Sequence, residues 1–342
     1  MIVGGSTARP VKIEDLLESR LSARLDRLDF RSRKIFAGKM QGERRSKKRG
    51  QSVEFDDYRE YVSGDDLRHI DWNVFARFDR LFIKLFLEEE DLALHVALDA
   101  SASMDAGEPS KLVFASRLAM ALAYVGLCGN NRVGLSVFGV PGMFAPDADA
   151  EGEGRSKVSI SRLADLRGKH HVPRVARFLM DSVWPESRRS GPAGGAGLTT
   201  FSDALTTIAR QRVGKGVMVV ISDFLIDPKA GGYEVGLRSL AAAGGYDTWA
   251  MQVLSPSELE PEREVQAGVT GDLRLTDIET GRAAEVTITA PLIRKYKERL
   301  ERYCNDLHSY CAARQITHVL TRSDASIETL ILETLRRQGM VG

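Results

Sequence analysis

An acidic side chain and two hydroxyls directly follow an apolar run within residues 95–104. The run ends on Asp99, and Ser101 and Ser103 stand at the two alternate positions after it. If the run is a buried parallel strand, Asp99 lies at its carboxyl end, which is where ligands bind in open α/β sheets. Carboxylate and hydroxyl oxygens are hard donors that suit a small hard cation. The spacing therefore predicts a site for Mg²⁺ or Mn²⁺.

Two later segments can complete such a site. Residues 217–223 repeat the pattern of an apolar run that ends on an acid, Asp223, and Thr199 stands in a Gly-rich loop ahead of a predicted helix. If these segments converge, two carboxylates and three hydroxyls surround the ion. Mg²⁺ keeps several waters in near-octahedral geometry, so neutral hydroxyls with one or two acids are expected to leave its charge under-neutralised and a position open. That position would attract an acidic side chain of a partner protein, which is recognition without bond-making.

Two other interpretations of Asp99 stay open. Ser and Asp are common at helix caps, so the pattern alone is also compatible with a capped helix start. An aspartate at a strand end could instead accept a phosphoryl group, as in a metal-dependent phosphoryl-transfer or hydrolytic enzyme. Phosphatases of the haloacid dehalogenase type resemble this opening but place a second Asp where this chain has Ser101. No Walker A, GxSxG or HExxH motif occurs, so we expect a protein that is not an enzyme.

The elements that must position these residues alternate between strands and helices. Continuous apolar runs predict strands, and apolar residues at helical spacing predict helices. The order predicts a doubly wound, mostly parallel, Rossmann-like α/β sheet over residues 91–342. Alternating segments at 273–277 and 284–288 predict an inserted β-hairpin near 272–289. The predicted strands are 92–98, 133–138, 157–160, 217–223, 246–254 and 315–320, and the predicted helices are 110–127, 172–183, 198–211, 233–243, 292–314 and 327–337.

Residues 1–90 are predicted to form a separate N-terminal extension. Leucines at helical spacing predict an amphipathic helix over 11–29, and a strongly basic run follows at 31–49. The run could contact nucleic acid or an acidic protein, or it could be a solvated loop. Because its only aromatic residue is Phe36, it has little means of stacking on bases. Nucleic-acid binding is therefore the weaker hypothesis for this run.

Acids, arginines and aromatics are densely mixed over residues 50–90. Such residues form networks of Arg–carboxylate pairs, which are bidentate where geometry allows. The network either clamps the N-terminal segment to the main domain or forms a docking surface for a partner, and we favour the clamp. The residues singled out for either role are Asp65, Asp66, Arg68, Asp71 and Trp72.

Composition narrows the class of protein. The 342 residues are 43% hydrophobic with a net charge of +1, which favours a folded chain over a disordered one or a polycation. Three cysteines without a CxxC pair are typical of a reduced cytosolic protein. The start has no apolar signal region, and no window approaches eighteen uncharged apolar residues. We therefore expect a soluble cytoplasmic protein without a membrane span.

The candidate ligands together resemble the metal-ion-dependent adhesion site of von Willebrand factor type A domains; they are Asp99, Ser101, Ser103, Thr199 and Asp223. The resemblance implies that the two serines and one Asp or Thr bind the metal directly, while the others act through water. That family usually has Gly-Gly-Thr where this chain has Gly197-Leu198-Thr199. Thr199 therefore departs furthest from the pattern.

A longer resemblance, to the domain-of-unknown-function 58 family, covers almost the whole chain. It is carried by Glu54-Phe55, Tyr58-Arg59, Tyr61, Gly64-Asp65-Asp66, Arg68, Ile70-Asp71-Trp72 and, further on, Asp277-x-Glu279-Thr280-Gly281. Members of this family typically accompany MoxR-type AAA+ ATPases and are thought to act as partners or adaptors in the maturation or assembly of other proteins. The resemblance thus implies a bacterial, chaperone-like interaction protein. Its expected partners are such an ATPase, a client that offers an acidic side chain to the metal, or both.

Overall fold

The computed structural model describes residues 9–31, 55–86, 92–141, 159–185, 200–211, 215–226, 231–262, 272–276, 283–287 and 289–342. The chain divides into two compact units, one formed by Met1–Ile35 with Leu92–Gly342 and the other by Phe36–Asp91. The predicted N-terminal extension, 1–90, is thus divided between the two units. Most of the basic run at 31–49 lies outside the described residues.

The first unit is built on a six-stranded sheet in the order β10-β7-β6-β3-β4-β5. All neighbouring strands are parallel except β4 and β5, which are antiparallel. The central strands are buried along their whole length, as their continuous apolar runs require. This confirms the predicted α/β class with a mostly parallel sheet. The strands are β3 (Ala93–Asp99), β4 (Arg132–Phe138), β5 (Ile160–Leu166), β6 (Gly216–Ser222), β7 (Tyr246–Leu254) and β10 (Thr317–Arg322).

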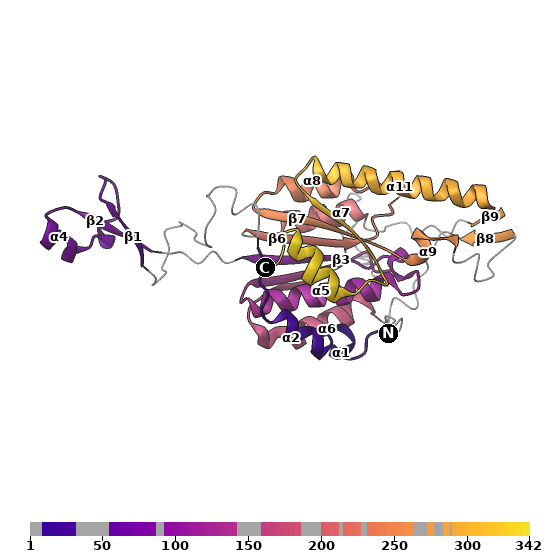
Figure 1. The fold of residues 1–342 in the computed structure, drawn as a ribbon, viewed down its shortest axis with the longest axis horizontal. Helices are drawn as coiled ribbons and strands as arrows, with labels where there is room; N and C mark the ends of the chain where they lie inside the picture. The colour runs from indigo at the N-terminus through magenta and orange to yellow at the C-terminus, as the bar shows by residue number, and fades with distance from the viewer. Residues whose placement is uncertain are drawn as a thin grey trace, which may run out of the picture. The chain divides into compact units, whose positions relative to one another are not determined.

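Helices cover both faces of this sheet (Figure 1). On one face the apolar core is formed with α1 (Ile13–Leu16), α2 (Ser19–Leu25), α5 (Lys111–Cys128), α6 (Val172–Val183), α12 (Ile327–Thr329) and the π-helical η6 (Leu330–Leu335). On the other face it is formed with α7 (Phe201–Arg210), α8 (Glu234–Ala242) and α11 (Ala290–Ala312). Two separate cores on one sheet are what a doubly wound fold requires.

Helix α5 is the one described helix that is long and apolar enough to cross a membrane by length and composition. Of its residues, 89% are buried inside the protein, because the helix lies between the sheet and the other helices of its face. A core helix explains this composition without a membrane.

The predicted amphipathic helix at 11–29 is two short helices instead. Leu17 ends α1 with an extended backbone, and α2 begins at Ser19. The leucines of the predicted amphipathic helix are nevertheless buried, since Leu16, Leu25 and Leu28 lie in the core under α5. Packing therefore decides the position of these leucines even though the helix is interrupted.

The strand order reverses at β3. From β3 the chain moves to β4 and β5 on one side, and it later adds β6, β7 and β10 on the other. The carboxyl ends of β3 and β6 are therefore neighbours at the switch point, which is where open α/β sheets form their ligand crevice. Helix α9 (Pro256–Leu259) follows β7 directly at the same end of the sheet.

Two further strand pairs lie outside this sheet. Strands β8 (Asp272–Thr276) and β9 (Ala283–Thr287) pair antiparallel ahead of α11, and the residues that join them lie outside the described ranges. In the second unit, β1 (Phe55–Glu60) and β2 (Phe82–Phe86) are also antiparallel, and η1 (Leu67–His69) and α4 (Trp72–Phe78) connect them. Sequence analysis did not predict β1 or β2, since their acidic and basic residues hide the strand alternation.

Candidate metal centre

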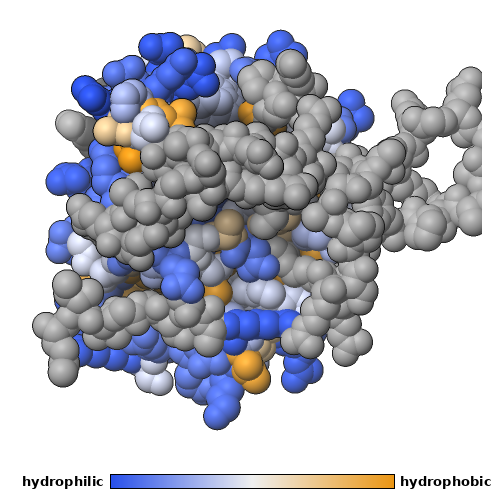
Figure 2. All heavy atoms as spheres, turned by 90° about the vertical axis from the view of Figure 1, so that its right-hand side faces the viewer, coloured by the Kyte–Doolittle hydropathy of each residue, from blue (hydrophilic) through white to orange (hydrophobic). Residues whose placement is uncertain are grey.

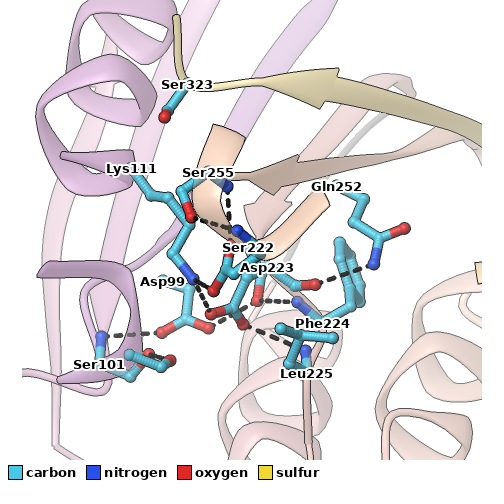
Figure 3. A network of polar contacts seen from close by, with 12 residues as sticks. Asp99, Ser101, Lys111, Ser222, Asp223, Phe224, Leu225, Gln252, Ser255 and Ser323 are labelled. Atoms are coloured by element: carbon cyan, nitrogen blue, oxygen red, sulfur yellow. Dashed lines mark hydrogen bonds and ion pairs between the residues drawn. The ribbon is translucent and has the colours of Figure 1, made fainter. Parts of the chain in front are cut away.

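Asp99 and Asp223 lie at the carboxyl ends of two neighbouring strands, at the switch point of the sheet (Figure 3). Asp99 is the last residue of β3, and Asp223 comes directly after β6. The two strands are in register at Leu98 and Ile221, so their carboxyl ends coincide. Ser222 Oγ donates a 2.7 Å hydrogen bond to Asp99 Oδ2 and so ties the two ends together. Both carboxyl groups are buried, at 5% and 2% exposure for the two residues.

Ser101 and Ser103 bring hydroxyls to the same corner. The Ser101 amide donates to Asp99 Oδ1 at 2.9 Å, which turns the chain sharply after β3. The Ser101 and Ser103 Oγ atoms are then 3.1 Å apart, and Ser103 begins the short helix η2 (Ser103–Asp105). Both serines are half-buried, so their hydroxyls lie between the buried carboxylates and solvent. The alternate spacing seen in the sequence thus places two oxygen donors side by side.

Gly139 leaves room for this turn. Its φ of +75° lies in the left-handed region, and an added Cβ would come within 3.0 Å of Asp99 Oδ1 and 3.2 Å of the Ser101 amide nitrogen. A side chain there would therefore press on the atoms that hold Asp99. This glycine follows β4, the other neighbour of β3, and sequence analysis did not single it out.

The segment after Asp223 is held from several sides. Phe224 has a φ of +55° and is fully buried, a backbone conformation that non-glycine residues adopt rarely and most often near functional sites. Tyr303 of α11 donates a 2.7 Å hydrogen bond to the Phe224 carbonyl, and Gln252 of β7 donates one of 3.0 Å to the Asp223 carbonyl. Asp223 is therefore positioned by both the sheet and α11.

The fifth predicted ligand, Thr199, lies outside the described residues. Its neighbour Thr200 is the N-cap of α7, where its hydroxyl accepts from the Asp203 amide at 3.1 Å and donates to the Asp203 carboxylate at 2.7 Å. Of the predicted set, the structure thus brings together Asp99, Ser101 and Ser103, with Asp223 adjacent.

Sequence analysis missed a lysine at the centre of this site. Lys111, the first residue of α5, has a side chain that is 1% exposed, and its Nζ lies 2.8 Å from Asp223 Oδ2 and 2.5 Å from Glu258 Oε1. Glu258 belongs to α9, where its other oxygen accepts from the Ser255 amide in a capping box. Burial lowers the pKa of the Lys111 ammonium, but the two carboxylates outweigh burial and leave that pKa above its usual value. Lys111 is therefore a charged, fully paired ammonium.

Asp99 has no such counter-charge. Within the described ranges, no lysine, arginine or histidine forms an ion pair with it; the donors of its hydrogen bonds there are neutral, namely the Ser101 amide, the Ser222 hydroxyl and the Ser101 hydroxyl. Burial, and next the nearby Asp223 carboxylate, raise the pKa of Asp99 to about 6, against the opposing effect of those hydrogen bonds. At neutral pH the site thus holds a buried, ionised Asp99 carboxylate. Another cation would be needed to neutralise its charge.

This donor set fits a small divalent ion. The Asp99 carboxylate accepts hydrogen bonds from neutral donors, and the two half-buried serines that follow it place their hydroxyls 3.1 Å apart. Mg²⁺ and Mn²⁺ bind through such oxygen ligands and fill the remaining positions with water. Among the described residues no group of three His, Cys, Asp or Glu side chains could hold a metal, so an ion at Asp99 would depend on the serine hydroxyls and on water for its other ligands.

The surface at this end of the sheet is polar where it can be described. Figure 2 views the right-hand side of Figure 1, where α9 lies, and the coloured residues are mostly hydrophilic with single hydrophobic residues between them. Isolated apolar residues are normal on a protein surface.

The other singled-out residues lie in the second unit and hold it together. Asp71 caps α4, accepts a 2.8 Å hydrogen bond from the Tyr58 hydroxyl, and pairs with Lys84 Nζ at 3.0 Å. Asp65 receives Arg59 at 2.8 Å through both of its oxygens. These contacts link the β1–β2 pair to the segment between its strands.

Asp66 and Trp72 have more exposed roles in that unit. Asp66 caps η1, and the Arg68 side chain, 86% exposed, pairs with it at 2.8 Å. Trp72 is 63% exposed and packs edge-to-face on Phe75 within α4. The predicted Arg–carboxylate pairs therefore exist within the unit, whereas a clamp to the other unit stays a prediction.

Comparison with known proteins places the chain in a family. The sequence profile of the family described as "Protein of unknown function DUF58" matches residues 57–304, which run from β1 into α11. The uncharacterized proteins Rv1480 of Mycobacterium tuberculosis and Mb1516 of Mycobacterium bovis are each 28% identical over 282 residues, covering 81% of this chain and 77% of theirs. The matched span includes both Asp99 and Asp223. The chain therefore belongs to the DUF58 family.

Proposed function

We propose that this protein is a non-enzymatic interaction module that binds a partner protein through a divalent cation held by Asp99, Ser101 and Ser103. Thr199 and Asp223 complete the site, as the resemblance to a metal-ion-dependent adhesion site of a von Willebrand factor type A domain implies. The ion is Mg²⁺ or Mn²⁺. An acidic side chain of the partner takes its open position.

The observation that carries this proposal is the environment of Asp99. Its carboxylate is buried beside two half-buried serines and is paired with no cation in the described part of the chain. An unpaired buried charge is costly, and a metal ion at this position would remove that cost. Because Asp223 is already paired with Lys111, the Asp99 carboxylate and neutral hydroxyls would leave the bound ion with a net positive charge that can attract a further anionic ligand.

The partner is a MoxR-type AAA+ ATPase, a client protein, or both, and the protein acts as an adaptor in the maturation or assembly of that client. This assignment rests on the family resemblance. The three free cysteines favour a cytoplasmic location.

One observation favours a second candidate, a hydrolytic or phosphoryl-transfer enzyme that uses Asp99. The pKa of Asp99 is raised to about 6, and strongly shifted pKa values are frequent among catalytic groups. Incubation with acetyl phosphate and Mg²⁺, followed by mass spectrometry of the peptide that contains Asp99, separates the two candidates. The interaction module predicts no covalent phosphate on Asp99, whereas its appearance would favour the enzyme.

The direct test measures partner binding with and without the ion. A purified MoxR-type ATPase from the same genome is immobilised, and binding of the full chain is followed by biolayer interferometry in Mg²⁺ and in EDTA. The wild type should bind only in Mg²⁺, and Asp99→Ala should lose that binding while it keeps its fold. Asp181→Ala, which removes an exposed carboxylate from α6, is the matched control. Full binding by Asp99→Ala in EDTA would refute the proposal.

A further inference from the structure

The buried ion pair of Lys111 has no explanation in the proposed metal site itself. Lys111 Nζ contacts Asp223 Oδ2 at 2.8 Å and Glu258 Oε1 at 2.5 Å, and the lysine side chain is 1% exposed. A buried ion pair stabilises a fold weakly at best, because the desolvation of both charges offsets their attraction. An apolar residue at the start of α5 would fill the same space. Its position beside a candidate metal ligand is therefore the informative feature.

The two aspartates of the site differ in how their charge is neutralised. Asp223 is paired with Lys111, and its other oxygen, Oδ1, accepts from the Leu225 amide at 3.1 Å. Among the described residues, Asp99 receives hydrogen bonds from neutral groups alone. A divalent ion that enters between them would meet the full charge of Asp99 but only the already neutralised charge of Asp223 (Figure 3).

Glu258 gives the ammonium a second partner. One oxygen of Glu258 contacts Lys111 Nζ and the other accepts a 2.7 Å hydrogen bond from the Ser255 amide, so the carboxylate is fixed by the cap of α9. Ser255 is itself buried against Gly107, where an added Cβ would lie 2.5 Å from the Ser255 Cβ. The lysine is thus shared between a rigid carboxylate of α9 and the carboxylate of the metal site.

We propose that Lys111 is an affinity-setting residue: it competes with the divalent cation for Asp223, and Glu258 limits that competition by drawing the ammonium towards α9. This inference rests on the proposed metal site. While the Lys111–Asp223 pair is intact, Asp223 acts on the ion through water, and Asp99 and the two serines bind it directly. The pair thereby weakens metal binding, so that the ion is held firmly only when a partner's carboxylate adds its charge.

The competition predicts that substitutions at Lys111 and at Glu258 change the Mn²⁺ affinity in opposite directions. Lys111→Met removes a positive charge and frees Asp223, so Mn²⁺ should bind about tenfold tighter or more. Glu258→Gln leaves Lys111 with Asp223 alone and removes a nearby negative charge, so Mn²⁺ should bind about threefold to tenfold more weakly. A lysine that served only to stabilise the fold would not change the affinity in opposite directions.

Isothermal titration of Mn²⁺ into the metal-free full chain measures these affinities. A double-mutant cycle separates competition for Asp223 from a general loss of positive charge. In an Asp223→Asn background, Lys111→Met should increase the Mn²⁺ affinity less than twofold. Lys169→Met, which removes an exposed lysine that pairs with Asp26, is the matched control and should leave the affinity unchanged. Equal gains in both backgrounds, or an unchanged Mn²⁺ affinity in Glu258→Gln, would overturn the inference.

The outcomes also separate this inference from the proposed function. If the wild type binds no Mn²⁺ on its own and Lys111→Met binds it, the inference holds, and the partner-binding measurement in Mg²⁺ and in EDTA then decides the proposed function separately. If the wild type binds Mn²⁺ and neither variant changes the affinity, the inference alone fails. If no form binds Mn²⁺, both are refuted. Should Lys111→Met not fold, as judged by circular dichroism, the Glu258→Gln titration decides by itself.

Discussion

Ser222 Oγ donates a 2.7 Å hydrogen bond to Asp99 Oδ2 and thereby links the carboxyl ends of β6 and β3. The donor is neutral, as is the Ser101 amide on the other oxygen. The described part of the chain therefore holds Asp99 in place without neutralising its charge. This arrangement favours a metal ion as the missing counter-charge, and it predicts how substitutions at the site should behave.

Asp99→Asn should stabilise the metal-free protein and remove Mn²⁺ binding. Asparagine keeps the size of the side chain, and its oxygen can still accept from the Ser101 amide, while the uncompensated buried charge disappears. The raised pKa of Asp99 corresponds to a gain on the order of 1–3 kcal/mol at neutral pH. Thermal unfolding in EDTA should show a higher Tm for the variant. A Tm several degrees below that of the wild type would mean that the Asp99 charge is already compensated.

Gly139→Ala should weaken Mn²⁺ binding more than its backbone strain alone explains. The residue has a left-handed φ, which costs alanine about 1 kcal/mol, and the added Cβ would press on Asp99 Oδ1 and the Ser101 amide. Gly231→Ala provides the control, since Gly231 has a φ of +96° but nothing lies within 4 Å of its added Cβ. Both variants should lose stability in urea unfolding, and only Gly139→Ala should lose Mn²⁺ affinity. Equal affinities would show that the turn tolerates the methyl group.

Tyr303→Phe should loosen the segment that carries Asp223. The Tyr303 hydroxyl donates to the buried Phe224 carbonyl at 2.7 Å, and its loss should cost about 1–2 kcal/mol in urea unfolding. Tyr310→Phe is a matched control on the same helix, because the Tyr310 hydroxyl donates at 2.7 Å to the Glu234 carbonyl in α8. Mn²⁺ affinity should fall in Tyr303→Phe and stay unchanged in Tyr310→Phe. A similar fall in both would assign the effect to α11 as a whole.

The second unit should lose stability in acid through Asp71. The hydrogen bonds of Lys84 and then Tyr58 hold the pKa of Asp71 at about 2, below its usual value of 3.8. Because the folded unit binds this proton less tightly than the unfolded chain, the contribution of Asp71 to stability is complete above about pH 4 and is lost as the pH falls towards 2. The NMR resonance of the Trp72 indole can follow this loss.

In Asp71→Asn the second unit should be less stable than in the wild type at pH 7. Its stability should also fall less between pH 4 and pH 2. Asp79→Asn is the control, since Asp79 is exposed at the left-handed C-cap of α4, a conformation that asparagine also tolerates. An acid transition of wild-type size in Asp71→Asn would exclude Asp71 as its cause.

The central strands and their acidic ends could be predicted from the sequence because their signals are local. A parallel strand that is buried on both faces is a continuous apolar run, and in β3 and β6 each run stops at an aspartate. The two strands lie far apart in the sequence but become neighbours through the doubly wound order. The position of Asp99 and Asp223 thus follows from the fold class.

Lys111 and Glu258 could not be predicted, because nothing local marks them. Lys111 is a charged residue in the first turn of a helix, where exposure is the ordinary expectation, and Glu258 lies among several other acidic and basic residues that follow Pro256. They meet only because α5 and α9 both begin at the carboxyl end of the sheet. The break between α1 and α2 is likewise set by packing, since the leucine spacing alone favours one continuous helix.

The most direct test of the metal site is a titration of the metal-free full chain with Mn²⁺, followed by electron paramagnetic resonance. The wild type should bind one ion saturably, and the Ser101→Ala/Ser103→Ala double variant should bind it at least tenfold more weakly with an unchanged Tm in EDTA. Ser309→Ala, on the exposed side of α11, should behave as the wild type does. Absence of saturable binding by the wild type, or equal binding by the double variant, would contradict the account.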